Sequence, residues 1–350
     1  MKLSEVIEAL VEERGLEEDI LSDIVCEGML AAYEKRYPNL VLRVSFDKKK
    51  DSLSIEVEKD VVSVVEDDEF EISVRKAKAF SDTAAAGTKL WIPFTLPIGR
   101  IEILKAKQII AQKIRQIEAL AIYKSFKDRE GTILQGVVHK MERGGTTIKI
   151  QDHLAFLPKS LSVPGERLPV GHPIRVLIKE VLEQPRSENQ LILDRSSAAF
   201  VEKLFSLEIP EVFERLVEIK KIVRIPGYKT KIAVISHDSN IDPVGTCVGV
   251  GGVRIKPILK ELGTEKVDII AWTDNLEVLI KGSLKPAEIN RVELSDDNTV
   301  AKIFLDDDQR SLAIGKMGQN ITLASELSGV HIELVQSDNG DLDEKLSEEF

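Results

Sequence analysis

The segment AIGKMGQNI, from Ala313 to Ile321, interrupts an otherwise helical pattern with two glycines that flank a lysine and a methionine. A related segment, CVGVGGVRI from Cys247 to Ile255, lies 66 residues upstream. With a one-residue shift the similarity continues, because ELGTEKVDI (residues 261–269) aligns with ELSGVHIEL (residues 326–334) and their apolar positions coincide. An internal repeat of about 65 residues predicts two small domains of the same fold.

Each copy of the repeat reads as a strand, a short helix, a Gly-x-x-Gly turn, a second helix and a closing strand. In the first copy, Asp242 is the expected N-cap and Pro243 the first helical residue. Gly249 is expected to close that helix, and Gly252 to open a second one that runs to Gly263. The second copy is predicted to contain a strand at 300–305, a helix at 306–314 and a helix at 319–327.

A Gly-x-x-Gly turn between two helices is typical of the KH domain, which clamps about four nucleotides of single-stranded nucleic acid. Glycines let a nucleic-acid backbone come close, and N–H groups at the start of the second helix can face phosphates. A tight structural turn is the alternative, but duplication in the same context favours nucleic-acid binding. The predicted RNA-binding residues are Gly249, Val250, Gly251, Gly252, Arg254, Lys256, Gly315, Lys316, Met317, Gly318, Gln319 and Asn320.

The rest of the chain predicts an α+β multidomain protein. Residues 1–128 should form an α/β N-terminal domain with helices at 3–11 and 19–37, a hairpin near 42–57 and a long connector helix at 102–127. Residues 129–198 read as five short strands, which favours an OB-type barrel over a small SH3-like one. Apolar residues alternate along the segment at Ile133, Val137, Ile148 and Ile150. The expected KH domains span 199–282 and 283–336, followed by an acidic tail at 337–350, expected to be disordered.

Charge is distributed unevenly around a net value of −11. Residues 1–82 hold 12 basic and 21 acidic residues, whereas residues 219–260 hold eight basic and two acidic residues. An acidic head followed by a basic middle is compatible with a nucleic-acid partner despite the negative total. No signal peptide or membrane span is recognisable, so we expect a cytoplasmic protein.

The sequence contains no recognisable catalytic constellation, so we expect neither an enzyme nor a cofactor. Cys247 lies in an apolar helical setting without a partner histidine, which favours core packing over a nucleophile. The five histidines are scattered, so no metal site is predicted. The run Asp306 to Asp308 stands at a helix start, where capping is a better explanation than metal binding.

IDPVGTCVGVGGVRI (241–255) followed by AIGKMGQNITLASELSG (313–329) closely resembles the NusA family of transcription elongation and termination factors. The order of acidic head, barrel and two KH domains is similar to that family over almost the whole chain. Two positions depart from it: the family usually has a basic residue where Gly251 stands and arginine where Thr322 stands.

The resemblance implies a head that docks on core RNA polymerase, with the barrel and KH pair holding emerging single-stranded RNA. It also implies modulation of pausing, intrinsic termination and antitermination, with other elongation or antitermination factors as further partners; we expect a monomer. A ribosome-associated protein and an RNA-processing enzyme are the alternatives. Phosphorolytic nucleases place such modules after a long catalytic region, for which this chain has no room.

Overall fold

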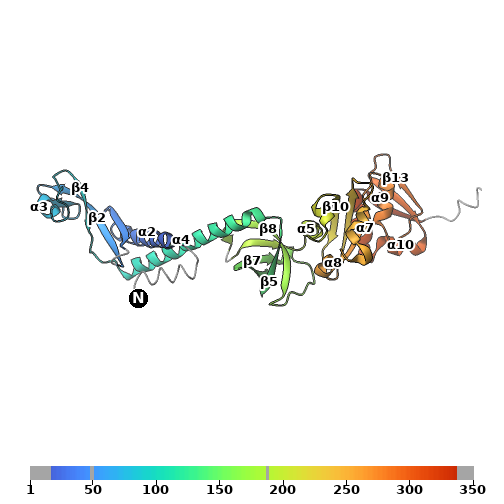
Figure 1. Ribbon diagram of the computed structural model, residues 1–350, viewed down its shortest axis with the longest axis horizontal. Helices are drawn as coiled ribbons and strands as arrows, with labels where there is room; N and C mark the ends of the chain where they lie inside the picture. Colours follow the sequence, from blue (N-terminus) through green and yellow to red (C-terminus); the bar gives the residue numbers. More distant parts are fainter. Residues whose placement is uncertain (1–16, 48–50, 187–188, 337–350) are drawn as a thin grey trace, which may run out of the picture. The chain divides into compact units, whose positions relative to one another are not determined.

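A computed structural model describes residues 17–47, 51–186 and 189–336 (Figure 1). The predicted helix at 3–11, the turn at 48–50 and the acidic tail at 337–350 lie outside the described residues. The chain divides into two compact units, residues 1–122 and residues 123–350.

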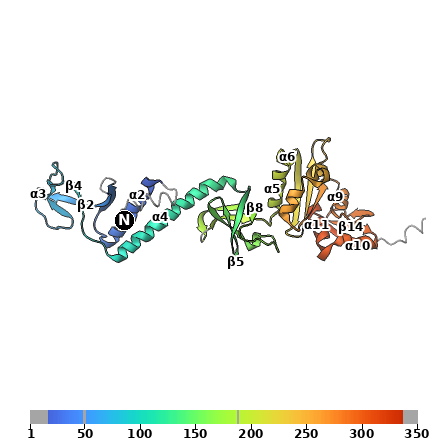
Figure 2. The ribbon, with the colours of Figure 1, turned by 60° about the horizontal axis from the view of Figure 1, so that its bottom comes forward.

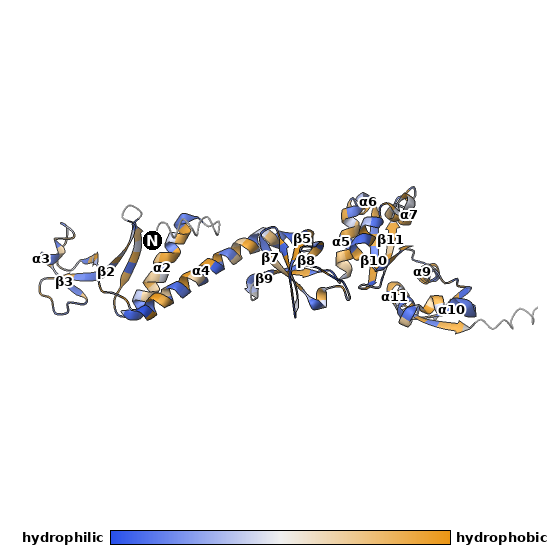
Figure 3. Ribbon diagram, turned by 90° about the horizontal axis from the view of Figure 1, so that it is seen from below, coloured by the Kyte–Doolittle hydropathy of each residue, from blue (hydrophilic) through white to orange (hydrophobic). Residues whose placement is uncertain are grey.

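The first unit is built on two packed helices, α2 (Glu18–Arg36) and α4 (Arg100–Phe126). Both predicted helices are therefore confirmed, with ends within two residues of those expected. Orange and blue alternate along α4 in Figure 3, and its apolar residues meet Leu21 and Ile24 of α2. Gly28 permits this approach, because a Cβ at that position would lie 2.4 Å from Cγ1 of Ile110.

A four-stranded sheet completes the first unit. Its first two strands form the predicted antiparallel hairpin, with Leu42 opposite Val57. Strand β3 then pairs parallel to β2, and β4 pairs antiparallel to β2. The elements are β1 (Leu42–Asp47), β2 (Ser52–Val62), β3 (Glu71–Ser73), α3 (Val74–Ala77) and β4 (Lys89–Pro93).

The second unit begins with a closed five-stranded barrel whose strand order is β5-β6-β7-β9-β8. Strands β7 and β9 pair in parallel and the other neighbours pair antiparallel, so the OB-type prediction is confirmed. The apolar alternation read at Ile133 and Val137 is one residue out of phase with burial in β5, because Val138 is buried while Val137 is 43% exposed. The strands are β5 (Ile133–Glu142), β6 (Gly145–Ile150), β7 (His153–Pro158), β8 (Pro173–Arg186) and β9 (Asn189–Asp194), with 3₁₀ turns η1 (Lys127–Arg129) and η2 (Lys159–Leu161).

Two KH units follow, each with a three-stranded sheet in which the first pair is antiparallel and the second parallel. The first consists of α5 (Ala198–Glu208), α6 (Pro210–Phe213), β10 (Val217–Ile225), β11 (Lys229–Ser236), α7 (Pro243–Val248), η3 (Val250–Gly252), α8 (Lys256–Leu262) and β12 (Lys266–Ala271). The second consists of α9 (Leu276–Ser283), β13 (Arg291–Leu294), β14 (Val300–Leu305), α10 (Asp307–Ile314), η4 (Lys316–Gly318), α11 (Gln319–Ser328) and β15 (His331–Gln336).

The sheet registers confirm the internal repeat. Lys229 pairs with Lys266 at the start of the first parallel ladder, and Val300 pairs with His331 at the start of the second. Equivalent residues of β12 and β15 are therefore 65 positions apart, the shift found in the sequence. The two KH units are two copies of one supersecondary design.

Both faces of the first KH sheet are covered. Alternate residues of β11, including Ile232 and Val234, face α5, α7 and α8 in one apolar cluster. The opposite face contributes Ala233, which packs with residues of α9 and α11, so the second KH unit covers it. Figure 2 shows α9 and α11 beside this sheet. The cluster comprises Val223, Ala233, Ile270, Leu279, Leu323 and Leu327.

An ion pair between a buried lysine and a half-buried aspartate lies at that same interface. Lys231 Nζ lies 2.8 Å from Asp268 Oδ2, and the lysine side chain is fully buried. The equivalent residues of the second sheet, Lys302 and Glu333, are register partners too, but both are exposed. The same strand position is therefore interior in one copy and surface in the other.

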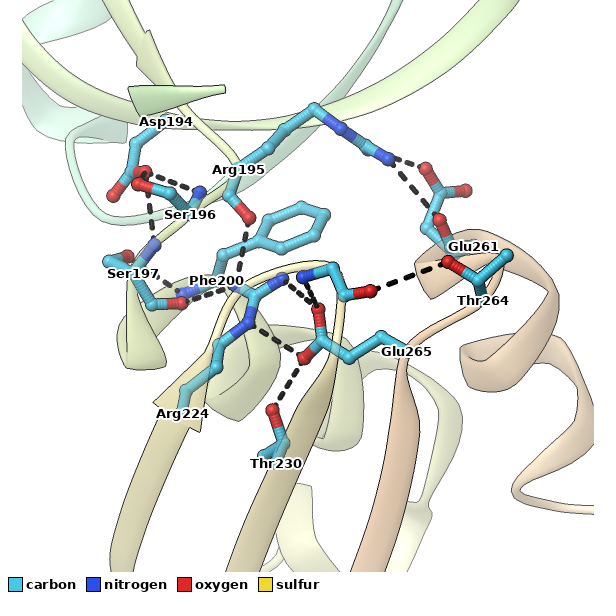
Figure 4. Close-up of polar contacts among 11 residues, drawn as sticks. Asp194, Arg195, Ser196, Ser197, Phe200, Arg224, Thr230, Glu261, Thr264 and Glu265 are labelled. Atoms are coloured by element: carbon cyan, nitrogen blue, oxygen red, sulfur yellow. Dashed lines mark hydrogen bonds and ion pairs between the residues drawn. The ribbon is translucent and has the colours of Figure 1, made fainter. Parts of the chain in front are cut away.

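The barrel joins the first KH unit through two arginines stacked on one ring (Figure 4). The guanidinium carbons of Arg195 and Arg224 lie 5.0 and 5.8 Å from the centre of the Phe200 ring. Arg195 is buried and bonds Glu166 of the barrel and Glu261 of α8, the latter at 2.6 Å. These contacts fasten the barrel to the KH helix that follows the first loop.

Arg224 completes this junction from β10. Its Nε donates to Glu265 Oε1 at 2.8 Å, and its Nη1 donates to the backbone carbonyls of Arg195 and Ser197. Glu265 is itself buried and also accepts from the backbone N–H of Gly227. Because every charge here has a partner, the buried network holds the two modules in one arrangement.

Burial of Lys231 predicts a pH-dependent stability. Desolvation lowers the pKa of Lys231 below its ordinary 10.5, although Asp268 partly opposes the shift. Because the folded state then binds this proton less tightly, the cost of burying the charge is fully present at neutral pH. It falls as the pH rises through the folded-state pKa towards 10.5.

The free energy of unfolding of the parent, relative to Lys231→Met, should therefore increase between pH 7 and pH 10. Urea unfolding of both proteins at several pH values measures this difference. A difference that stays constant across the range would contradict the assignment.

Candidate nucleic-acid interface

Each loop follows a short helix whose start is defined by the sequence. At α7, the Asp242 carboxylate accepts from the Val244 N–H at 3.1 Å and Pro243 is the first helical residue, as predicted. At α10, Asp306 occupies the N-cap position, but its side chain accepts from Asn290 Nδ2 instead of capping. The capping bond expected at the second helix is thus not formed, although the run does stand at the helix start.

The two loops share one backbone conformation. Their first glycines, Gly249 and Gly315, have φ of 72° and 70°, and their last, Gly252 and Gly318, both have φ of 75°. The third residue is also left-handed in both: Gly251 has φ of 62° and Met317 has φ of 54°. Glycine at 251 therefore suits a position whose backbone conformation is costly for other residues.

The second helix of the first copy begins later than predicted. Residues 250–252 form a 3₁₀ turn, in which the Gly252 N–H donates to the Gly249 carbonyl at 3.0 Å, and α8 starts only at Lys256. Pro257 then occupies the first turn of α8, where its missing N–H is harmless. The N–H of Gly252 is therefore engaged within the turn, contrary to the idea that it opens the helix.

The first glycine of each loop is needed for a second reason. A Cβ on Gly249 would lie 2.9 Å from Cγ of Arg254, and a Cβ on Gly315 would lie 2.7 Å from Cβ of Asn320. The residue five positions later thus packs directly against the loop. Gly318 meets nothing within 4 Å, so only its left-handed φ favours glycine there.

The loop tips project into solvent. Val250 is 95% exposed and Met317 is 87% exposed, and Gly251 and Lys316 are exposed beside them. An apolar side chain so exposed at the tip of a rigid turn is available for contact with a ligand. Lys316 is the one basic residue inside either loop.

The remaining predicted site residues differ in accessibility. Lys256 is exposed on α8, whereas Gln319 is half-buried and its Oε1 is without a hydrogen-bond partner. Arg254 Nη1 donates to Glu211 Oε1 at 2.8 Å and to the Thr246 carbonyl. Asn320 is only 4% exposed, so its side chain faces the interior and not the solvent.

A further surface was missed because the barrel pattern was assigned one residue out of phase. Val137, Lys149 and Leu154 lie opposite one another across β5, β6 and β7, and all three are exposed. Half-buried Phe156 follows on β7. Correct phasing of β5 from Leu134 and Val138 would have revealed this mixed apolar and basic row.

The cysteine and metal predictions concern other parts of the chain. Cys247 is fully buried in the first KH core, and desolvation raises the pKa of its thiol to about 12, which suits a packing role. Within residues 17–47, 51–186 and 189–336, no group of three or more His, Cys, Asp or Glu side chains could hold a metal ion. No helix in those ranges is long and apolar enough to cross a membrane.

The left-handed φ of Met317 predicts an unusual response to glycine. Met317→Gly should raise the free energy of unfolding by about 0.5–1 kcal/mol. The free energy gained by relieving the strained φ exceeds the extra conformational entropy that a glycine loses on folding. Lys316→Gly is the matched control and should lower it by a similar amount, since φ at Lys316 is not positive. Urea denaturation measures both; a loss of stability in both variants would contradict the strain argument.

Comparison with known proteins agrees with this arrangement. The family model of the NusA N-terminal domain matches residues 2–119, that of the NusA-like first KH domain residues 195–272, and that of the NusA-like second KH domain residues 276–341.

Curated relatives match over nearly the whole chain. The transcription termination/antitermination protein NusA of Thermus thermophilus is 34% identical over 98% of this chain and 92% of its own length. The transcription termination/antitermination protein NusA of Bacillus subtilis is 31% identical over 95% of this chain and 90% of its own length. The solution structure of the N-terminal domain of NusA from B. subtilis is 27% identical, covering 33% of this chain and 95% of that one with a TM-score of 0.27. On the sequence matches, this chain belongs to the NusA family.

Proposed function

We propose that this protein is a transcription termination and antitermination factor that holds single-stranded RNA in its two Gly-x-x-Gly loops while its head docks on RNA polymerase. The observation that carries the proposal is the matched pair of loops, with the same left-handed backbone and with exposed tips. Acting on emerging RNA beside the polymerase, the protein would modulate pausing, intrinsic termination and antitermination in the cytoplasm.

The two loops hold RNA by different means. In the second loop, the exposed Lys316 supplies a positive charge to a phosphate. The first loop has no charged residue at its tip, so it depends on close backbone approach and on the exposed Lys256 that follows. Val250 and Met317 offer apolar surface to bases or sugars at the two tips.

We assign the roles by domain. Residues 1–128 are the polymerase-binding head, 129–198 the barrel and 337–350 an acidic tail. The expected boundary between the KH domains, 199–282 and 283–336, moves back to residue 276, because α9 packs in the core of the second KH unit. The acidic excess of residues 1–82 supports a protein partner for the head, since it would repel RNA. The exposed row of Val137, Lys149 and Leu154 supports an auxiliary RNA contact on the barrel.

The names of the relatives favour transcription over the ribosome and over RNA processing as the setting. Pull-down from a bacterial lysate distinguishes these settings. Recovery of core polymerase subunits is expected, whereas recovery of ribosomal proteins without polymerase would favour the alternative. Other elongation or antitermination factors should appear in the same pull-down as polymerase.

Lys316 and Val250 provide a sharp test of the RNA-binding proposal. Each phosphate neutralised on a single strand contributes a slope of roughly −0.7 to log affinity against log salt concentration. Lys316→Ala should therefore reduce the magnitude of the slope by about 0.7, while Val250→Ala should leave it unchanged. Fluorescence anisotropy with a single-stranded RNA over a salt series gives both slopes. Equal slopes for Lys316→Ala and the parent would mean that Lys316 does not neutralise a phosphate.

Replacing both inner residues of a loop by aspartate extends this test. The variants are Val250→Asp with Gly251→Asp, and Lys316→Asp with Met317→Asp. Each puts negative charge where a phosphate would lie, so each should lose RNA affinity while circular dichroism confirms folding. If the folded variants bind RNA as tightly as the parent, the loops are structural turns and the proposal fails.

The head should bind polymerase without RNA. Residues 1–128 alone should bind core polymerase with an affinity that falls as salt rises, because the acidic surface contributes electrostatic attraction. Surface plasmon resonance against immobilised core enzyme measures this, with residues 129–350 as the comparison. Binding by residues 129–350 and not by the head would reverse the assignment of roles.

A further inference from the structure

The residue five positions after the first glycine has the same structural task in both loops. Arg254 Nη1 donates to the carbonyl of Thr246 at 3.1 Å, and Asn320 Nδ2 donates to the carbonyl of Leu312 at 3.2 Å. These two carbonyls are equivalent, because each belongs to the residue three before the first glycine of its loop. In both copies, a side chain beneath the loop thus secures the end of the preceding helix.

Asn320 also reaches beyond its own KH unit. Its Oδ1 accepts a hydrogen bond from Lys229 Nζ at 3.2 Å, and Lys229 lies on β11 of the first KH unit. Its Nδ2 additionally approaches the carbonyls of Ala313 and Leu284 at 3.3 Å. One buried amide therefore contacts the helix before the second loop, the segment that follows α9 and the first KH sheet.

We propose that Lys229 and Asn320 are positioning residues that couple the second RNA-binding loop to the first KH unit. This inference rests on the proposed RNA binding by the loops. Lys229 acts through Asn320, whose Cβ and backbone N pack against Gly315 at the start of the loop. A change at Lys229 is transmitted to the loop through this single amide.

The physical basis is the orientation of the amide. An asparagine side chain has a donor end and an acceptor end, which differ in what they can face. Here the donor end faces backbone carbonyls and the acceptor end faces the Lys229 ammonium. Without the ammonium, rotating the Asn320 amide by roughly 180° costs less free energy. In the rotated amide, the oxygen faces the backbone carbonyls at the end of α10 and repels them. Lys229 thereby adds to the preference of the carbonyls for the orientation that supports the loop.

Lys229 is placed to position and not to bind RNA. Its side chain is only 13% exposed, and its Nζ lies 2.7 Å from Asp268 Oδ2, so it is already paired with a carboxylate that it shares with Lys231. Asp268 retains Lys231 as a partner when Lys229 is replaced. A substitution at Lys229 therefore removes the bond to Asn320 without leaving the Asp268 carboxylate unpaired.

Lys229→Met tests the coupling because methionine keeps the apolar stem and removes the donor. The matched control is Lys266→Met, which removes the exposed lysine paired opposite Lys229 on β12. We expect Lys229→Met to weaken binding of a single-stranded RNA about threefold to tenfold with an unchanged salt slope. Lys266→Met should change affinity less than about twofold, and Lys229→Arg, which retains a donor, should restore binding.

A double-mutant cycle locates the effect. If Lys229 acts through the second loop, Lys316→Ala should cost less affinity in the Lys229→Met background than in the parent. Lys256→Ala, on the first loop's helix, should cost the same in both backgrounds. Urea unfolding of each variant confirms that the fold is retained. Should Lys229→Met be poorly folded, Lys229→Leu, which also removes the donor, takes its place in the cycle.

Each other outcome has a distinct meaning. Additive effects of Lys229→Met and Lys316→Ala would overturn the coupling while leaving RNA binding by the loops intact. A salt slope that falls by roughly 0.7 in Lys229→Met would make Lys229 a direct phosphate ligand and also overturn it. If neither Lys316→Ala nor Lys256→Ala affects binding, the proposed function itself fails.

Discussion

The first KH sheet has two faces to bury, and the RNA-binding half of the chain depends on how both are covered. Three strands cannot form a stable layer unless apolar side chains are removed from water on at least one face. The first sheet buries one face under α5, α7 and α8 and the other under α9 and α11 of the second KH unit. The two KH units therefore share a core.

In the second KH sheet, the residues equivalent to Lys231 and Asp268 of the first sheet are exposed. At the position of the buried Lys231 the second sheet has the exposed Lys302, and opposite that residue Glu333 is exposed as well. The repeat thus uses one strand design in two environments. In the interior copy, the lysine needs Asp268 because an unpaired buried charge would be far more costly than a paired one. Asp268 also pairs with Lys229, whose Nζ donates to Asn320 beneath the second loop.

Function would rest on the contrast between rigid loop bases and exposed tips. Side chains at the base of each loop hold the preceding helix and the first glycine in place, while Val250 and Met317 project into solvent. A ligand that binds such a preorganised turn loses little further conformational entropy from the protein. At the other end of the first KH unit, Arg195 and Arg224 fasten the barrel through Phe200, so the barrel surface keeps a constant relation to the first loop.

The sequence by itself determined the repeat, the location of both loops and the helices and strands that flank them, but it did not indicate α3, α5, α6 or α9. Glycine spacing, the Asp242–Pro243 helix start and alternation within the strands are local signals, and local geometry decides them. It also indicated the OB-type barrel, although the phase of β5 was misassigned because Val137 and Val138 are both apolar and adjacent. Only burial reveals which of the two faces inward.

The tertiary structure alone decided which polar residues lie inside. Asn320 belongs to a loop motif and was predicted to contact RNA, yet it is buried because α11 packs against the first sheet. Lys231 and Lys302 are the same residue type at equivalent positions, with opposite burial. Arg195 is also buried by contacts that only the tertiary structure makes, because its partners Glu166 and Glu261 lie 29 and 66 residues away in the chain. Such pairings depend on contacts between distant segments, and no short sequence pattern specifies them.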